Sequence, residues 1–235
     1  MLKRELRRGI GCAAGLLLPP VGAAFFRLAA VVEMLYRRSW PTRDITYYDQ
    51  RFAHLAGPGT WRAVERGIIG ASFLRPHSRL LDLCCGDGTF DRYYFAPLCA
   101  EVVAVDRDPS AIHLASRVNR HPKIRWIAAD VATEVLPGSD YHAVFMFASL
   151  QYFTLDDAVR VMNGVAAALL PGGVFVGSVP EEVHANQGKG DKSGWNEGEL
   201  KAFLKQHFDE ATVWRGASGQ IYFSSTTAVP AWAHA

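Results

Sequence analysis

The sequence predicts an α/β protein in three layers, in which a mostly parallel sheet of seven strands lies between two layers of helices. Short apolar runs alternate with segments of helical spacing between residues 61 and 180, and this is typical of strand–helix–strand units. Two more strand-like segments flank a glycine turn at 216–219, which predicts a closing antiparallel hairpin. An N-terminal helical arm, residues 1–43, is expected to precede this domain, residues 44–235.

Periodicity and capping residues define the first half of the domain. Apolar residues at helical spacing predict a helix over Trp61–Leu74, and the apolar run Leu80–Leu83 predicts the first strand. Glu101–Asp106 has the character of a second buried strand. Asp108 is suited to cap the next helix, because Pro109 follows it at the first helical position.

The second half continues the alternation. The remaining parallel strands are expected at Ile124–Ala129, Tyr141–Phe147 and Val174–Val179. The helices are expected from Thr154 to Leu170 and over Leu200–His207, the second after a capping box that begins at Asn196. The hairpin pairs Ala211–Trp214 with Gln220–Thr227, whereas the polar, glycine-rich segment Glu181–Trp195 predicts a loop.

The N-terminal 43 residues differ in charge from the rest of the chain. They carry eight Lys and Arg residues against two acidic ones, whereas the remainder carries 17 basic and 21 acidic side chains. A protein that binds nucleic acid is expected to have a basic face on its folded domain. The acidic balance of residues 44–235 therefore weakens that interpretation.

Four interpretations of the arm remain open. It is a helical arm packed on its own domain or on a second subunit, a signal peptide, a transmembrane span, or two short helices lying on a membrane face. A span would place Pro19-Pro20 at its centre, where proline breaks helical hydrogen bonding. Surface association would use residues 1–38, with their basic side chains at the lipid headgroups.

The cysteines indicate a reducing compartment. Cys12, Cys84, Cys85 and Cys99 show no paired metal spacing, and two of them are adjacent. We interpret them as reduced thiols, which predicts a cytoplasmic protein without a metal site. If the arm binds lipid, the expected location is the inner face of a membrane.

The expected functional centre is Arg79–Phe90. A buried strand that contains Asp82 passes into a loop with Gly86 and Gly88, and then into a segment able to form a helix. Such a junction binds nucleotides through main-chain amides, and glycine lets a ligand approach the main chain closely. Asp106 ends the next strand, where an acidic side chain meets ribose hydroxyls. The Gly-x-Gly-x-x-Gly pattern of a nicotinamide-binding domain would need glycine at Asp91.

These residues resemble the first motif of class I S-adenosylmethionine-dependent methyltransferases, an acidic residue followed by glycines at alternate positions. Here the motif is Asp82-Leu83-Cys84-Cys85-Gly86-Asp87-Gly88, in which Cys84 replaces the first glycine. Pro171-Gly172-Gly173 resembles the turn before the family's fifth strand, and the resemblance covers about Trp61–Thr227. It implies a Rossmann-like sheet, S-adenosyl-L-methionine as cofactor and methyl transfer as activity.

The resemblance also implies roles for single residues. Asp82 would attract the ammonium group of the cofactor, and Asp106 would accept from both ribose hydroxyls. Asp130 and the amide of Val131 would recognise the adenine edge, and Arg107 would cover its face. The residues expected to bind the cofactor are therefore Asp82, Cys84, Gly86, Asp87, Gly88, Asp106, Arg107, Asp130 and Val131.

The acceptor is expected beyond the carboxyl ends of the first and fourth strands. The residues expected to line its pocket are Tyr47, Tyr48, Arg51, Gln151 and Tyr152. His184 is the candidate for a general base, with an ordinary solvated histidine as the simpler alternative.

The predicted function is transfer of a methyl group, by in-line displacement, to an oxygen atom of a small-molecule, glycan or lipid-linked acceptor. DNA is not expected as a substrate, since the chain lacks both the Asn/Asp-Pro-Pro-aromatic motif and the Pro-Cys pair of base methylation. The alternatives are a non-catalytic, nucleotide-binding regulatory subunit and an RNA methyltransferase. The sequence leaves the oligomeric state open.

Overall fold

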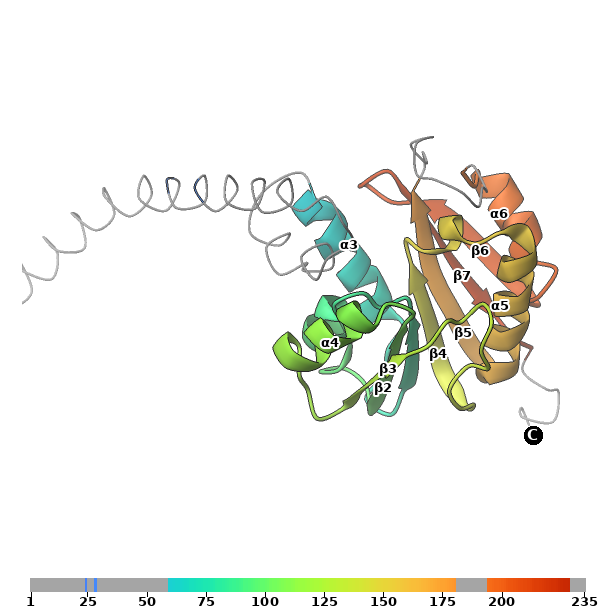
Figure 1. The fold of residues 1–235 in the computed structure, drawn as a ribbon. Helices are drawn as coiled ribbons and strands as arrows, with labels where there is room; N and C mark the ends of the chain where they lie inside the picture. Colours follow the sequence, from blue (N-terminus) through green and yellow to red (C-terminus); the bar gives the residue numbers. More distant parts are fainter. Residues whose placement is uncertain (1–23, 25–27, 29–58, 181–193, 229–235) are drawn as a thin grey trace, which may run out of the picture. The chain divides into compact units, whose positions relative to one another are not determined.

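A computed structural model describes residues 59–180 and 194–228, together with Ala24 and Leu28 (Figure 1). The chain divides into two compact units, Met1–Thr60 and Trp61–Ala235, and the fold described below belongs to the second. The predicted arm at residues 1–43 lies outside the described residues, apart from the two single positions. None of the helices in the described part is both long and apolar enough to cross a bilayer.

The centre of the domain is a seven-stranded sheet with the order β3-β2-β1-β4-β5-β7-β6. The strands are β1 (Arg79–Leu83), β2 (Glu101–Asp106), β3 (Ile124–Ala128), β4 (Tyr141–Phe147), β5 (Leu169–Pro180), β6 (Glu210–Arg215) and β7 (Gln220–Thr226). Strands β1 to β5 are parallel, whereas β7 runs antiparallel to both β5 and β6. The predicted fold class is therefore confirmed, including the closing hairpin.

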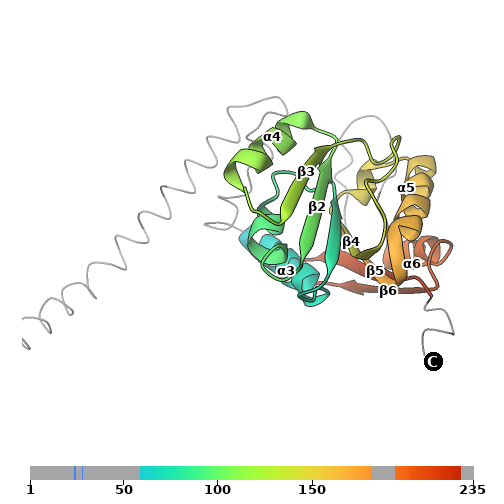
Figure 2. The same ribbon diagram turned by 90° about the horizontal axis from the view of Figure 1, so that it is seen from below.

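The two faces of the sheet are covered by different helices (Figures 1 and 2). The helices are α3 (Gly59–Ser72), α4 (Pro109–Val118), α5 (Leu155–Ala168) and α6 (Glu197–Leu204). Buried residues of α5 and α6 pack on the face that Leu81 and Leu83 share, and α3 and α4 cover the face of Leu80. Because side chains alternate along a strand, Asp82 of β1 points to the same face as Leu80.

Short polar caps begin three of the helices. The Asp108 carboxylate accepts from the Ser110 amide at the start of α4, and Thr154 caps α5. Asn196 and Glu199 form a capping box at the start of α6. Each cap satisfies main-chain amides that have no partner inside the helix, as the sequence predicted.

Two elements differ from the prediction. The helical segment after the glycine loop is short and continues as a π-helical turn, Asp91–Phe95. Strand β5 begins at Leu169, five residues before the predicted start at Val174. Its pairing with β4 shifts register between the partners of Tyr141 and Ala143, so the predicted turn at residues 171–173 is an irregularity inside a strand.

Candidate functional site

Two buried carboxylates lie at the edge of the sheet where the parallel strands end. Asp82 is 5% exposed in β1, and Asp106 is 6% exposed as the last residue of the adjacent strand β2. Asp130 follows β3 at the same edge and is half-buried. The structure thus brings together the three acidic side chains that the sequence singled out.

Asp106 ties the glycine loop to the sheet. One of its carboxylate oxygens accepts from the amide of Gly86 at 2.9 Å, and the other accepts from the amide of Asp108 at 2.9 Å. Burial raises the pKa of Asp106, while these two hydrogen bonds act to lower it. The carboxylate therefore holds the loop in place without any ligand.

The loop backbone has the conformation that glycine favours. The φ angles of Cys84, Gly86 and Gly88 are 60°, 60° and 69°. A side chain in this left-handed region costs about 1–2 kcal/mol, so Cys84 is strained at the position where the family motif has glycine. Cys84 thus adopts the left-handed backbone conformation that glycine would adopt at this position of the motif.

Asp87 and Asn119 stabilise the loop from within. The Asp87 carboxylate accepts from both the amide and the hydroxyl of Thr89, at 3.0 and 2.7 Å. Asn119 at the end of α4 donates to the Asp87 carbonyl oxygen at 2.7 Å. Asp87 as a whole residue is 1% exposed, so it stabilises the loop and presents almost no surface to a ligand.

Gly88 has no room for a side chain. A Cβ atom at this position would lie 2.1 Å from the Trp126 ring, which projects from β3 beneath the loop. The aromatic ring therefore packs directly on bare main chain. The sequence motif signalled Gly88 but gave no signal for Trp126.

Asp91 is a second buried acid beside Asp82. It is 0% exposed, and its carboxyl group forms a side-chain hydrogen bond with that of Asp82 when one of the two acids is protonated. Burial raises its pKa well above the ordinary value, and burial raises the pKa of Asp82 to about 7. Two acids enclosed together in this way share at least one proton at neutral pH, which leaves the other carboxyl group able to carry a negative charge.

The segment after β3 is built around Asp130. One carboxylate oxygen of Asp130 accepts from the Ala132 amide at 3.0 Å, and its own amide donates to Glu134 at 2.9 Å. Val131 is 8% exposed, whereas Arg107, at the tip of β2, is exposed to solvent. Their contacts with a nucleoside remain predictions.

Comparison with known proteins agrees with this geometry. Residues 80–173, which contain all but the first residue of β1, strands β2 to β4 and the glycine loop, match a family model described as a methyltransferase domain. Over this segment the chain is similar to the class I S-adenosylmethionine-dependent methyltransferases.

Solved structures of methyltransferases share the fold at low sequence identity. A DhpI complex with S-adenosylhomocysteine has a TM-score of 0.63 at 19% identity, covering 79% of this chain and 95% of that one. The N-methyltransferase NodS from Bradyrhizobium japonicum, also with S-adenosylhomocysteine, has a TM-score of 0.60 at 19% identity, covering 83% and 97%. At this identity the likeness establishes the fold alone.

Two curated relatives are similar over part of their length. Carboxy-S-adenosyl-L-methionine synthase of Pseudomonas paraeruginosa is 32% identical over 133 residues, 51% of each chain. An uncharacterised methyltransferase of Mycobacterium tuberculosis is 31% identical over 96 residues, 41% of this chain and 47% of the relative. The chain thus spans about half the length of these relatives.

The structure describes two of the residues that were predicted to line the acceptor pocket. Gln151 is 8% exposed, and its amide nitrogen donates to the Ala148 carbonyl oxygen at 2.7 Å. Its side-chain oxygen is buried, and no donor reaches it from the described residues. Tyr152 is 51% exposed. The other predicted residues, Tyr47, Tyr48, Arg51 and His184, lie outside the described part of the chain.

The sequence did not point to two charged residues, Asp91 and Arg66, whose charges act on Asp82. Asp91 was considered only as a mismatch to a nicotinamide-binding motif, although its place three residues after Gly88 puts it on the first turn of the following helix. Arg66 lies on α3, within a helix that the sequence did predict. Its neighbour Gln220 is 154 residues away in the chain, so no local pattern could have revealed the contact.

Proposed function

We propose that this methyltransferase transfers the methyl group of S-adenosyl-L-methionine, by in-line displacement, to an oxygen atom of a small-molecule, glycan or lipid-linked acceptor. The observation that supports this most is the tie between Asp106 and the amide of Gly86. It holds a loop of bare main chain between two buried carboxylates, ready to receive a cationic nucleoside. The reaction class follows from the family, whereas the acceptor atom is our inference.

The described residues fit the cofactor group by group. Asp82 offers a negative charge to the ammonium. Asp106 accepts two main-chain hydrogen bonds, and each carboxylate oxygen keeps a second lone pair for a ribose hydroxyl. Asp130 and the Val131 amide would contact the adenine edge, and Arg107 would cover the ring.

The protein's part in the chemistry is alignment. The cofactor supplies an electrophilic methyl group on a sulfonium, so the chain must orient the acceptor and exclude water. The buried oxygen of Gln151, unpaired among the described residues, is a suitable acceptor for a substrate hydroxyl. We keep Tyr47, Tyr48, Arg51 and Tyr152 as proposed pocket residues and His184 as the proposed base.

One relative favours a second candidate. The similarity to a protein named carboxy-S-adenosyl-L-methionine synthase raises the option that this chain makes or uses a carboxylated form of the nucleoside. Mass spectrometry of any nucleoside that co-purifies with the protein would test this, because the carboxylated form differs in mass from S-adenosylmethionine. Recovery of the carboxylated form would favour the second candidate over methyl transfer.

Calorimetric titration with S-adenosylhomocysteine tests the cofactor site. Asp106→Asn keeps the size of the side chain but leaves one oxygen to accept two amides, so we expect affinity to fall about 30- to 100-fold, equivalent to about 2–3 kcal/mol. Asp108→Asn is the matched control, since asparagine caps a helix as well as aspartate does. Equal affinities of the two variants would contradict the proposed role of Asp106.

Incubation with methyl-labelled cofactor tests the acceptor. Extracts divided into lipid, polysaccharide, small-molecule and RNA fractions should take up label in one of the first three. Label in RNA would favour the RNA methyltransferase alternative. Binding without transfer to any fraction would favour the regulatory subunit.

A further inference from the structure

Asp91 is a buried acid that the proposed contacts with the cofactor do not use. It begins the π-helical turn Asp91–Phe95, and turns of this kind often occur at functional sites. The residue is 0% exposed, and neither carboxyl oxygen has a basic side chain as its partner in the described part of the chain. A charged carboxylate is costly in such a place, so the acid is expected to hold a proton.

The packing of the π-helical turn places Asp91 beside Asp82. Asp91 and Phe95 are the buried residues of the turn, and the Phe95 ring lies 5.0 Å from the Phe145 ring, measured between centres. Phe145 on β4 is the register partner of Asp82 on β1, so their side chains share one face of the sheet. The carboxyl groups of Asp82 and Asp91 meet on this face and form a hydrogen bond.

The surroundings decide which of the two acids holds the proton. Asp91 is the more deeply buried, and the charge of Asp87 acts against a second negative charge there. Asp82, in contrast, has the Arg66 guanidinium nearby, which favours its charged form. Burial raises the pKa of both acids, to about 7 for Asp82, and their hydrogen bond lowers the pKa of Asp82 but raises that of Asp91. These directions are those of a protonated Asp91 that donates to Asp82.

The other titratable groups around the pair do not change this assignment. Burial raises the pKa values of the neighbouring thiols, so the thiols stay neutral, and the charge of Asp106 on β2 opposes a charge on Asp82. The charged and titratable groups that act on the pair are Arg66 on α3, Asp106 on β2, Cys84, Cys85 and Asp87 in the loop, and Cys99 before β2. Asp82 therefore changes its charge near neutral pH, and the donor on Asp91 sets where that change falls.

We propose that Asp91 is a positioning residue for the cofactor: its protonated carboxyl group donates a hydrogen bond to Asp82 and presents Asp82 as an oriented anion to the ammonium group. A hydrogen bond from O–H to a carboxylate is short and strong, so it fixes the direction of its acceptor. The proton stays on Asp91 when the cofactor binds, and any proton that Asp82 carries is released to the solvent. The inference depends on the proposed function, because it requires the ammonium to meet Asp82.

The test is calorimetric titration of the full-length protein with S-adenosylhomocysteine between about pH 6 and 9, with each variant compared to wild type at the same pH. Asp91→Asn keeps an N–H donor, so it should bind within about threefold of wild type throughout. Asp91→Leu has no donor, so the pKa of Asp82 should rise by about one to two pH units. Its binding should be about 10- to 100-fold weaker at pH 6, and the difference should shrink to about twofold at pH 9. Phe95→Leu loosens the same turn without removing a polar group, and it should show no such change with pH.

Infrared spectroscopy of the protein without ligand detects the proton itself. At about pH 8, above the pKa of about 7 for Asp82, wild type should show the band of a protonated carboxyl group. Asp91→Asn should lack this band, because the amide has no acidic proton. The absence of the band from wild type overturns the inference, and this measurement does not require Asp91→Leu to fold.

The remaining outcomes separate the inference from its alternatives. Equal losses of affinity in Asp91→Asn and Asp91→Leu would mean that Asp91 acts through a negative charge, which overturns the inference. A loss in Asp91→Leu that is the same at every pH would assign Asp91 a role in packing alone and would overturn it too. If wild type does not bind S-adenosylhomocysteine at any pH, the proposed function is refuted, whereas the infrared band still reports whether Asp91 holds its proton.

Discussion

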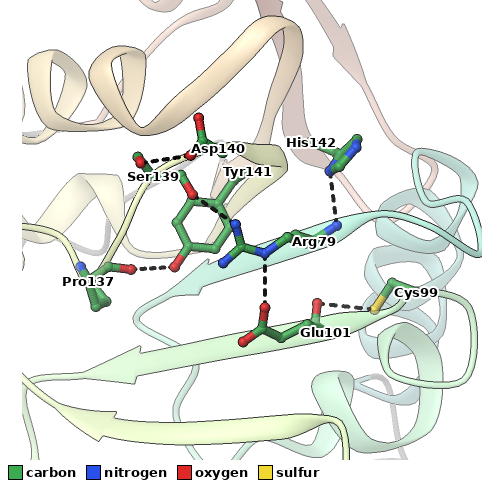
Figure 3. A network of polar contacts seen from close by, with 8 residues as sticks. All are labelled: Arg79, Cys99, Glu101, Pro137, Ser139, Asp140, Tyr141 and His142. Carbon is green, nitrogen blue, oxygen red and sulfur yellow. Dashed lines mark hydrogen bonds and ion pairs between the residues drawn. The ribbon is translucent and has the colours of Figure 1, made fainter.

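The two ends of the parallel strands are built differently. We call the end where these strands begin the amino edge of the sheet, and the end where they finish the carboxyl edge. At the amino edge, Arg79 donates to Glu101 at 2.9 Å and to the Ser139 carbonyl oxygen at 3.1 Å, and its guanidinium lies over the Tyr141 ring (Figure 3). The His142 ring accepts from the Arg79 amide at 3.2 Å (Figure 3). At this edge, each charged group in the network has a partner within the chain.

At the carboxyl edge, several polar groups lack a partner. The Nε–H of Arg66 and the side-chain oxygen of Gln151 are buried without one among the described residues, and the buried carboxyl group of Asp91 faces a second acid, Asp82. Backbone strain also differs between the edges. At the carboxyl edge, Cys84 and Ala148 have positive φ angles, which are unfavourable for these residue types. At the amino edge, the non-glycine residue with a positive φ among the described residues is Asp140, and aspartate tolerates this conformation. Two strained non-glycine residues and several of the buried unpaired groups thus lie where a ligand would bind.

The largest expected effect is at Gly88. A side chain there would meet both the φ of 69° and the Trp126 ring at 2.1 Å, so Gly88→Ala should lower the free energy of unfolding by about 3–4 kcal/mol. Urea unfolding measures this. Gly198→Ala on α6 is the control, because its Cβ meets nothing nearer than 3.4 Å and alanine favours a helix. Similar stability of the Gly88 variant and the wild type would show that Trp126 moves aside.

The acid pair predicts how stability depends on pH. Both Asp82 and Asp91 have pKa values raised by burial, to about 7 for Asp82. Below about pH 4 both states of the chain hold these protons. Between pH 4 and 7 the unfolded chain releases protons that the folded chain keeps, so stability falls as pH rises, by at most about 1.4 kcal/mol per pH unit for each proton kept.

Asp91→Asn should make that decline shallower, since one of the retained protons is gone. The measurement is the free energy of unfolding at several pH values between 4 and 8. Asp140→Asn at the amino edge is the control, because Asp140 is exposed and asparagine tolerates its φ of 61°. If the free energy of unfolding declines equally steeply with pH in the wild type and in Asp91→Asn, the buried acid pair is not the cause of the decline.

The contrast between the edges also shows how far the sequence could lead. The carboxyl-edge acids Asp82 and Asp106 were predictable because each ends or nearly ends a short apolar run, and the caps at Asp108 and Thr154 follow from local pairing. These features depend on neighbours within a few residues. Local signals therefore located the glycine loop and most element boundaries.

What the sequence could not show depends on long-range packing. Arg66 meets Gln220 only because α3 and the closing hairpin come together, and Trp126 meets Gly88 across two strands. The early start of β5 at Leu169 has the same origin, since pairing with β4 overrides the Pro-Gly-Gly turn signal. Periodicity in one segment contains no information about such partners.

Strain at Ala148 should be measurable by itself. Its φ of 51° is unfavourable for alanine, and its amide donates to the Ser178 carbonyl oxygen at 2.8 Å, which holds the conformation. Ala148→Gly should raise the free energy of unfolding by about 0.5–1 kcal/mol, whereas Ala166→Gly inside α5 should lower it by about as much. Loss of stability in both variants would mean that the Ala148 conformation is not strained.

The smallest expected effect is at the amino edge. The Arg79–Glu101 pair is well formed, but the two side chains are 38% and 39% exposed, so water screens it. Glu101→Gln should cost at most about 0.5 kcal/mol, and less in high salt. Affinity for S-adenosylhomocysteine should not change, because the ligand site lies at the opposite edge. Calorimetry on Glu101→Gln and on Asp106→Asn therefore compares how much each edge contributes to ligand binding. A loss of affinity in both variants would mean that the amino-edge network and the glycine loop are energetically coupled through β1 and β2.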